Sequence, residues 1–168
     1  RNIFIPLTVG GGVSSIQDAD KLLKAGADKV GVNSSAIRNP NLIKEISDNF
    51  GAQCMVAAID VKKTGATHSG WEVFVKGGRE ATGIDAKDWI LKVVDLGAGE
   101  ILLTSMDADG TQNGYDLEIT KFASTQTGVP VIASGGAGSV EHIDEVFKKG
   151  QADAALLASI LHFGTVSI

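Results

Sequence analysis

Two glycine-rich segments in this chain have the composition of anion-binding turns. Gly10-Gly11-Gly12 and Ser134-Gly135-Gly136 each follow a short apolar run. Glycine lets the backbone approach a ligand closely, so that its N–H groups and the start of the next helix can face a negative charge. Two such segments predict a ligand with a phosphate at each end. The alternative is that the glycines serve only tight turns.

Further donors come at the ends of the neighbouring apolar runs. Asn33 and Ser34 would add an amide and a hydroxyl to the first pocket, and Ser159 would add a hydroxyl to the second. Residue by residue, the predicted phosphate ligands are Gly11, Gly12, Asn33, Ser34, Gly135, Gly136 and Ser159.

Carboxylates and hydroxyls at other strand ends could transfer protons. Asp60 closes the apolar run Met55–Ile59 and is the first candidate for general acid or base. Asp109, in the motif that follows Ile101–Thr104, is the second candidate, although an Asx turn is an alternative explanation of that motif. Thr104 and Ser134 would point hydroxyls into the same cavity.

Other cofactor chemistry has no support in the sequence. The three histidines are scattered and form no cluster with metal-ligand spacing, so no metal is expected. A Gly-x-Gly-x-x-Gly fingerprint between strand and helix is also absent, and no dinucleotide cofactor is expected.

Lys29 and Glu100 each begin a strand, where a charge must be paired, functional or extended to solvent.

These residues are positioned by an alternation of strands and helices. Apolar runs without polar alternation indicate strands of a parallel sheet covered by helices. The expected strands are Ile3–Val9, Lys29–Val32, Met55–Ile59, Ile101–Thr104, Val129–Ala133 and Ala154–Leu157. The expected helices are Ser15–Ala25, Asn41–Phe50, Ala86–Leu96, Leu117–Thr127 and Val140–Lys149. Asp85 and Asp116 are expected N-caps, and left-handed C-caps are expected at Gly26, Gly97, Gly128 and Gly150.

An insert at about residues 64–83 interrupts this rhythm, and an internal repeat extends it. The insert reads as a hairpin, either a wall of the binding site or a tolerated surface loop. At an offset of 124 residues, Pro6 matches Pro130 and Gly12 matches Gly136. Such a repeat spans four βα units of about 31 residues, and eight units would make the roughly 250 residues of a (β/α)₈ barrel. We therefore predict one α/β domain over residues 1–168, an incomplete (β/α)₈ barrel of about six βα units.

Composition narrows the class of protein and its partners. The chain has 168 residues, a formal charge of −5 and 43% hydrophobic residues, which is ordinary globular composition. The mild negative charge without a basic block argues against nucleic acid and membrane as partners. No apolar run is long enough to span a bilayer, and a cytoplasmic location is expected.

Several motifs together resemble the cyclase subunit of imidazole glycerol phosphate synthase, of the phosphate-binding (β/α)₈ barrels. They are Thr8-Val9-Gly10-Gly11-Gly12, Ala27-Asp28-Lys29-Val30, Ala58-Ile59-Asp60, Gly70-Trp71-Glu72-Val73, the run from Gly97 to Ser105, the run from Asp107 to Asp116, and Ala133-Ser134-Gly135-Gly136. The sister isomerase of the same pathway shares the phosphate glycines but not the run from Gly97 to Ser105.

The resemblance implies a lyase of histidine biosynthesis that needs no cofactor. With ammonia from a glutaminase partner, it converts a bis-phosphorylated ribulosyl-formimino aminoimidazole carboxamide nucleotide to imidazole glycerol phosphate and aminoimidazole carboxamide ribotide. The resemblance also implies that Asp60 is one of two catalytic aspartates and that Gly110, beside Asp109, contacts the substrate. Lys29 and Glu100 match residues that gate ammonia, and Asp28 matches a residue that faces the glutaminase.

The chain also departs from that family. The resemblance aligns it with barrel strands three to eight, without the first catalytic aspartate, its loop or the final helix. We therefore expect weak or no activity from the isolated chain. The alternative is a non-catalytic barrel fragment that binds phosphate and self-associates through its open strand edges.

Overall fold

The computed structural model describes residues 4–166 and consists of alternating strands and helices. The strands of the main sheet are β1 (Thr8–Gly10), β2 (Lys29–Val32), β3 (Met55–Lys62), β6 (Glu100–Ser105), β7 (Val131–Ser134) and β8 (Ala154–Ala155). The longer helices are α1 (Ile16–Lys24), α3 (Asn41–Phe50), α4 (Ala86–Asp95), α5 (Leu117–Gln126) and α6 (Val140–Lys148). Shorter elements are α2 (Ser34–Arg38), the 3₁₀ turn η1 (Ala52–Cys54) and α7 (Ser159–His162).

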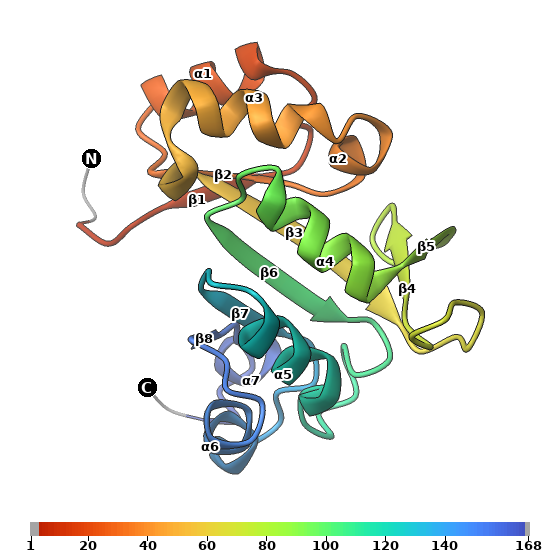
Figure 1. The fold of residues 1–168 in the computed structure, drawn as a ribbon. Coiled ribbons are helices and arrows are strands. Elements are labelled where there is room, and N and C mark those ends of the chain that lie inside the picture. Colours follow the sequence, from red (N-terminus) through yellow and green to blue (C-terminus); the bar gives the residue numbers. More distant parts are fainter. Residues whose placement is uncertain (1–3, 167–168) are drawn as a thin grey trace.

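The sheet follows chain order, β1-β2-β3-β6-β7-β8, and every neighbouring pair in it is parallel. Figure 1 shows the long helices along the outer side of this curved sheet, while its inner side lies open between the edge strands β1 and β8. The expected α/β class and the partial (β/α) barrel are therefore confirmed.

Side chains alternate between two environments along each central strand. On β3, Met55, Ala57, Ile59 and Val61 are buried against the helices. Ala58 and Asp60 lie between them in sequence and are only half-buried, because they face the open inner side. On the same inner side Val56 is buried, so the burial on both faces that unbroken apolar runs indicate holds at the start of β3 but not at Ala58 and Asp60.

The helix caps agree only in part with the sequence analysis. Asp85 and Asp116 are N-caps, since their carboxylates accept hydrogen bonds from the first-turn N–H groups of α4 and α5. Gly26 and Gly97 have the left-handed φ expected of a C-cap, at 107° and 103°.

Gly128 and Gly150 are not left-handed, so those two expectations are wrong. After α5 the chain leaves through Thr127 in an extended conformation. After α6 the left-handed residue is Gln151, with φ of 56°. Gly150 is needed for close packing instead, because a Cβ there would lie 2.7 Å from the Val146 carbonyl oxygen.

Several strand ends differ from the expected ones. The first strand was expected from Ile3, which lies outside the described residues, but β1 begins at Thr8, and Phe4 and Ile5 are exposed. β7 begins at Val131 rather than Val129, and β8 stops at Ala155. Two short helices that are not among the expected ones, α2 and α7, begin directly after Asn33 and Ala158.

The insert is a hairpin built onto β3. Strands β4 (Glu72–Val75) and β5 (Glu80–Asp85) pair antiparallel, and β4 also pairs antiparallel with Asp60–Lys62. That pairing extends β3 three residues past its expected end, so Asp60 lies within the strand rather than closing it. The hairpin is therefore part of the sheet rather than a free surface loop.

Across residues 4–166, no helix is both long enough and apolar enough to cross a membrane.

Candidate functional site

Three polar residues form one row across the carboxyl end of the sheet. The register pairs Asp60 with Thr104, and Thr104 with Ser134. Residues in register on adjacent parallel strands point to the same face, and this face is the open inner side. We call Asp60, Thr104 and Ser134 the polar row. It lies two residues along the strands from Ala58 and Leu102, which line the main cavity, but it lines neither of the pockets described below.

The environment of Asp60 favours its protonated form. Partial burial raises the pKa of its carboxyl, and the nearby charge of Asp109 raises it further. A hydrogen bond with the Asn33 side chain acts in the opposite direction. The structure thus brings together the two aspartates that the sequence suggested for acid–base chemistry. A carboxyl with a raised pKa can donate a proton nearer neutral pH than an ordinary aspartate.

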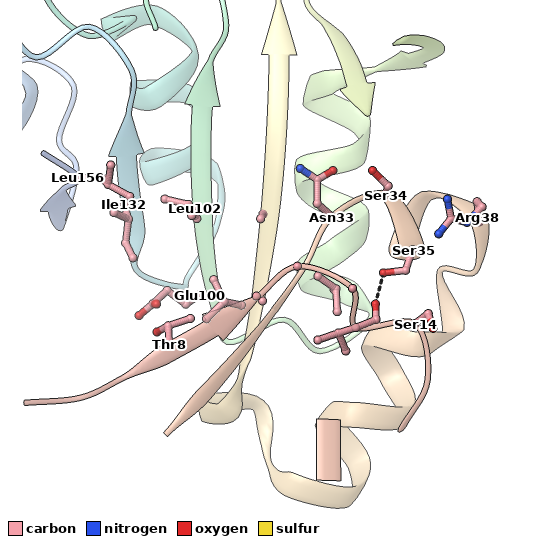
Figure 2. Close-up of a pocket in the computed structure, with 18 of the residues that line it drawn as sticks. Thr8, Ser14, Asn33, Ser34, Ser35, Arg38, Glu100, Leu102, Ile132 and Leu156 are labelled. Carbon is pink, nitrogen blue, oxygen red and sulfur yellow. Dashed lines mark hydrogen bonds between the residues drawn. The ribbon is translucent and has the colours of Figure 1, made fainter. Parts of the chain in front are cut away.

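The first pocket is a cavity of about 620 Å³ on the inner face. Figure 2 shows Asn33, Ser34, Ser35 and Arg38 on one side of it, whereas Thr8 and Glu100 lie on the other side. The lining residues from the predicted set are Gly11, Gly12, Asn33 and Ser34, joined by Ser14, Ser35 and Arg38. The structure therefore brings the two predicted donor segments, which are about 20 residues apart in sequence, to one place.

Backbone N–H groups are available in the first pocket. Gly11 and Gly12 have φ of 89° and 80°, in the region that favours glycine. Within residues 4–166, the Gly12 N–H donates no hydrogen bond to a protein acceptor. Helix α1 begins just beyond, with Ser15 as its N-cap. Unpaired N–H groups at a helix start suit a bound anion.

The second pocket lies at the carboxyl ends of β7 and β8 and has a volume of about 40 Å³. Its lining includes five of the predicted site residues, Asp109, Gly110, Gly135, Gly136 and Ser159, and four others, Gln112, Ala137, Leu156 and Ala158. The pseudosymmetry read from the sequence thus relates two real concavities. Tyr115 fixes their common border, because its hydroxyl donates to the Leu156 carbonyl oxygen at 3.1 Å.

The hairpin contacts the loops of both pockets. Near the first pocket, the Lys76 N–H donates to Ser34 Oγ at 3.2 Å. Toward the second, Gly78 packs so closely on Met106 that a Cβ at Gly78 would lie 2.4 Å from the methionine methyl. The hairpin therefore lies beside the site, as a wall would.

Two charges meet at the opposite, amino-terminal end of the sheet. Lys29 Nζ donates to Glu100 Oε2, and the two side chains are only 29% and 12% exposed. Extension into solvent, the simpler expectation for each residue alone, is therefore wrong, because the two charges neutralise each other. Asp28 lies beside them and accepts a hydrogen bond from the Leu7 N–H at 2.8 Å.

We expect this half-buried pair to be worth about 1 kcal/mol, between the values of exposed and fully buried pairs. The measurement is a double-mutant cycle of Lys29→Met and Glu100→Gln by urea unfolding. The exposed pair Lys24–Asp20 on α1 is the control, with an expected coupling of about 0.3–0.5 kcal/mol. Equal coupling energies in the two cycles would show that burial adds nothing.

Sequence analysis missed Arg38, Ser35 and Ser14 in the first pocket and Gln112 in the second. Ser35 holds the pocket wall, because its Oγ donates to the Val13 carbonyl oxygen. These residues were missed because α2 was not predicted. The helix begins after Asn33, and it places Ser35 and Arg38 in the same pocket lining as Gly11 and Gly12.

One histidine does meet two carboxylates, so the expectation that no histidine clusters with possible metal ligands is wrong for His68. The His68 ring lies 3.3 Å from Asp85 and 3.7 Å from Asp88. The three groups offer ligand atoms within 4.8 Å of one another. However, the two short contacts use opposite nitrogens of one ring, and Asp85 also accepts from the Ser69 N–H. His68 therefore links the insert to Asp85 and Asp88 at the start of α4.

Comparison with known proteins gives concordant matches. The sequence model described as "Histidine biosynthesis protein" matches residues 1–167. A relative from Prochlorococcus marinus subsp. pastoris is 60% identical over 162 residues, which is 96% of this chain and 64% of the relative. A relative from Bacillus cereus (strain Q1) is 60% identical over 99% of this chain and 65% of its own length.

A third relative, from Clostridium botulinum (strain Okra / Type B1), is 60% identical over 100% of this chain and 66% of its own length. All three carry the name "Imidazole glycerol phosphate synthase subunit HisF". The chain therefore spans just under two thirds of the length of these relatives.

Proposed function

This chain belongs to the histidine biosynthesis protein family, and we propose that it provides the cyclase chemistry of imidazole glycerol phosphate synthase. The substrate would be the bis-phosphorylated ribulosyl-formimino aminoimidazole carboxamide nucleotide, with ammonia as the second reactant. The products would be imidazole glycerol phosphate and aminoimidazole carboxamide ribotide. The observation that carries the proposal is the polar row, which lies at the same end of the sheet as two glycine-lined pockets.

The two pockets would hold the two phosphates of this substrate. Each offers backbone N–H groups and at least one hydroxyl: Ser34 in the first pocket and Ser159 in the second. A ligand held at both ends would place its central, reacting atoms near the polar row. Holding the reactants in this way is itself a large source of rate enhancement, since it removes their freedom to move apart.

Asp60 and Asp109 would then move the protons. Ammonia addition and ring closure both require proton transfer to and from nitrogen. The raised pKa of Asp60 supports the acid role, and Asp109 would serve as its partner base. Thr104 and Ser134 would donate hydrogen bonds to the reacting groups from the same row.

Ammonia would enter from the opposite end of the sheet. Glu100 and Thr104 are four residues apart on β6, which is about 13 Å along the strand. Leu102 lies between them on the same face and lines the cavity with Glu100. The Lys29–Glu100 pair would be the gate, and Asp28 would face a glutaminase partner that supplies the ammonia.

The test is ammonia-dependent formation of imidazole glycerol phosphate. We expect weak or undetectable turnover by the chain alone. We expect turnover after addition of a fragment that carries the first two βα units of a full-length relative. If the relative is active under the same conditions but the mixture is not, the proposal is overturned.

A second candidate is a non-catalytic phosphate-binding protein that self-associates. It is favoured by the edge strands β1 and β8, each of which pairs with one neighbour in residues 4–166. An unpaired strand edge can recruit another chain. Sedimentation separates the candidates: a monomer that unfolds cooperatively argues against assembly through the edges.

A further inference from the structure

The two pockets differ in charge, although the repeat makes them alike in backbone. The first is lined by one basic residue, Arg38, in addition to glycines and hydroxyls. The lining of the second contains no basic residue and includes the carboxylate of Asp109. Despite the repeat, the two pockets need not bind the same anion with the same affinity.

Arg38 is an exposed residue of the first pocket's lining. It ends α2, four residues after Ser34, and Figure 2 shows it beside Ser34 and Ser35 on one side of the pocket. Within residues 4–166, its guanidinium has no ion pair or hydrogen bond with another residue. Glu100, the acidic residue of the same lining, is neutralised by Lys29.

Neighbouring cations do not provide a substitute for Arg38. The Lys76 backbone contacts Ser34, but the Lys76 ammonium is 2.5 Å from Glu80 and is therefore neutralised within the hairpin. Any net positive charge in the first pocket thus comes from Arg38. Guanidinium presents a planar pair of donors that matches two oxygens of a phosphate.

We infer that Arg38 is a phosphate ligand that makes the first pocket selective for a dianionic phosphate monoester, whereas the second pocket binds phosphate through neutral donors. This inference rests on the proposed function, and it adds which of the two phosphates is recognised by charge. The competing explanation is that Arg38 only stabilises the carboxyl end of α2, as a cation there can do.

The experiment is a titration of the folded chain with inorganic phosphate, followed by the backbone amide NMR signals of Gly12 and Gly136. These glycines report on the two pockets separately. We expect Arg38→Gln to raise the dissociation constant read at Gly12 about tenfold, which equals about 1.4 kcal/mol. At Gly136 the change should stay below about twofold. Arg79→Gln, on the hairpin and outside both linings, is the matched control and should change neither value.

Two further measurements distinguish a loss of the phosphate contact from a folding defect in the Arg38→Gln variant. Arg38→Lys keeps the charge and loses the planar fork, so its effect at Gly12 should be smaller than that of Arg38→Gln. In the unmodified chain, added sodium chloride should weaken binding at Gly12 more than at Gly136, because only the first pocket uses a full charge.

The outcomes separate the inference from the proposed function. If phosphate moves both signals but Arg38→Gln leaves the affinity at Gly12 unchanged, the inference fails and the proposed pockets stand. The same holds if salt weakens both pockets equally. If phosphate binds at neither glycine in the unmodified chain, the phosphate pockets of the proposed function fail as well.

Discussion

Replacing Asp60 by Asn should lower ammonia-dependent cyclisation by about 10²- to 10⁴-fold, the usual contribution of a positioned acid–base group. The amide keeps the shape and the hydrogen bonding of the carboxyl but cannot exchange a proton. Asn33 can still contact it, so substrate affinity should change much less than turnover. The measurement is the rate of imidazole glycerol phosphate formation in the complemented system described above.

The same substitution should stabilise the fold at neutral pH. The usual pKa of an aspartate is 3.8, and burial raises the pKa of Asp60 in the folded chain. Above pH 3.8 the unfolded chain therefore ionises Asp60 before the folded chain does, and folding loses stability as the pH rises. Asparagine is neutral at every pH, so the variant should have the higher Tm at pH 7.5, and the difference should shrink toward pH 4.

Lower activity together with higher stability would identify Asp60 as a group kept for chemistry at a cost in folding. Asp48→Asn, an exposed position on α3, is the control and should change neither quantity appreciably. Turnover retained within about threefold would remove Asp60 from the proposed acid–base role. Equal Tm values at pH 7.5 would instead contradict the electrostatic account of its environment.

Gly136→Ala should destabilise the chain by about 3 kcal/mol or more, whereas Gly12→Ala should cost about 1–2 kcal/mol. The two glycines are equivalent in the repeat and both have positive φ, at 101° and 80°. A Cβ at Gly136 would lie 1.9 Å from the Gly114 carbonyl oxygen. A Cβ at Gly12 would meet no atom within 4 Å. Only the first substitution therefore forces the backbone to move.

Urea unfolding of the two variants measures this difference directly. Gly136→Ala should also disturb the contact in which the Gly114 N–H donates to the Gly136 carbonyl oxygen at 2.8 Å. Loss of that contact would open the loop that lines the second pocket. Similar stabilities for both alanine variants would mean that backbone strain alone accounts for the glycines.

Much of the framework could be predicted from local sequence patterns. Helix α3 and strand β2 have the bounds expected from periodicity, and the repeat placed Gly12 and Gly136 in equivalent positions. These features depend on neighbours a few residues away or on a simple period. Such information is present in any short window of the sequence.

The bounds of β3 and the position of Arg38 could not be obtained that way. β3 extends to Lys62 because a hairpin strand from residues 72–75 pairs with it. Arg38 joins the pocket because α2 turns back toward Gly11 and Gly12. Both depend on partners that are distant in sequence, and local propensity carries no record of them.

The sequence by itself determined the parallel α/β order, the two glycine turns and the candidate aspartates, because residue type and spacing encode these directly. The tertiary structure alone decided which of them meet. Register placed Asp60, Thr104 and Ser134 in one row, and packing joined Lys29 to Glu100. The tertiary structure also placed an arginine in only one of the two similar pockets. A repeat in the backbone does not determine which charged side chains the surrounding segments contribute.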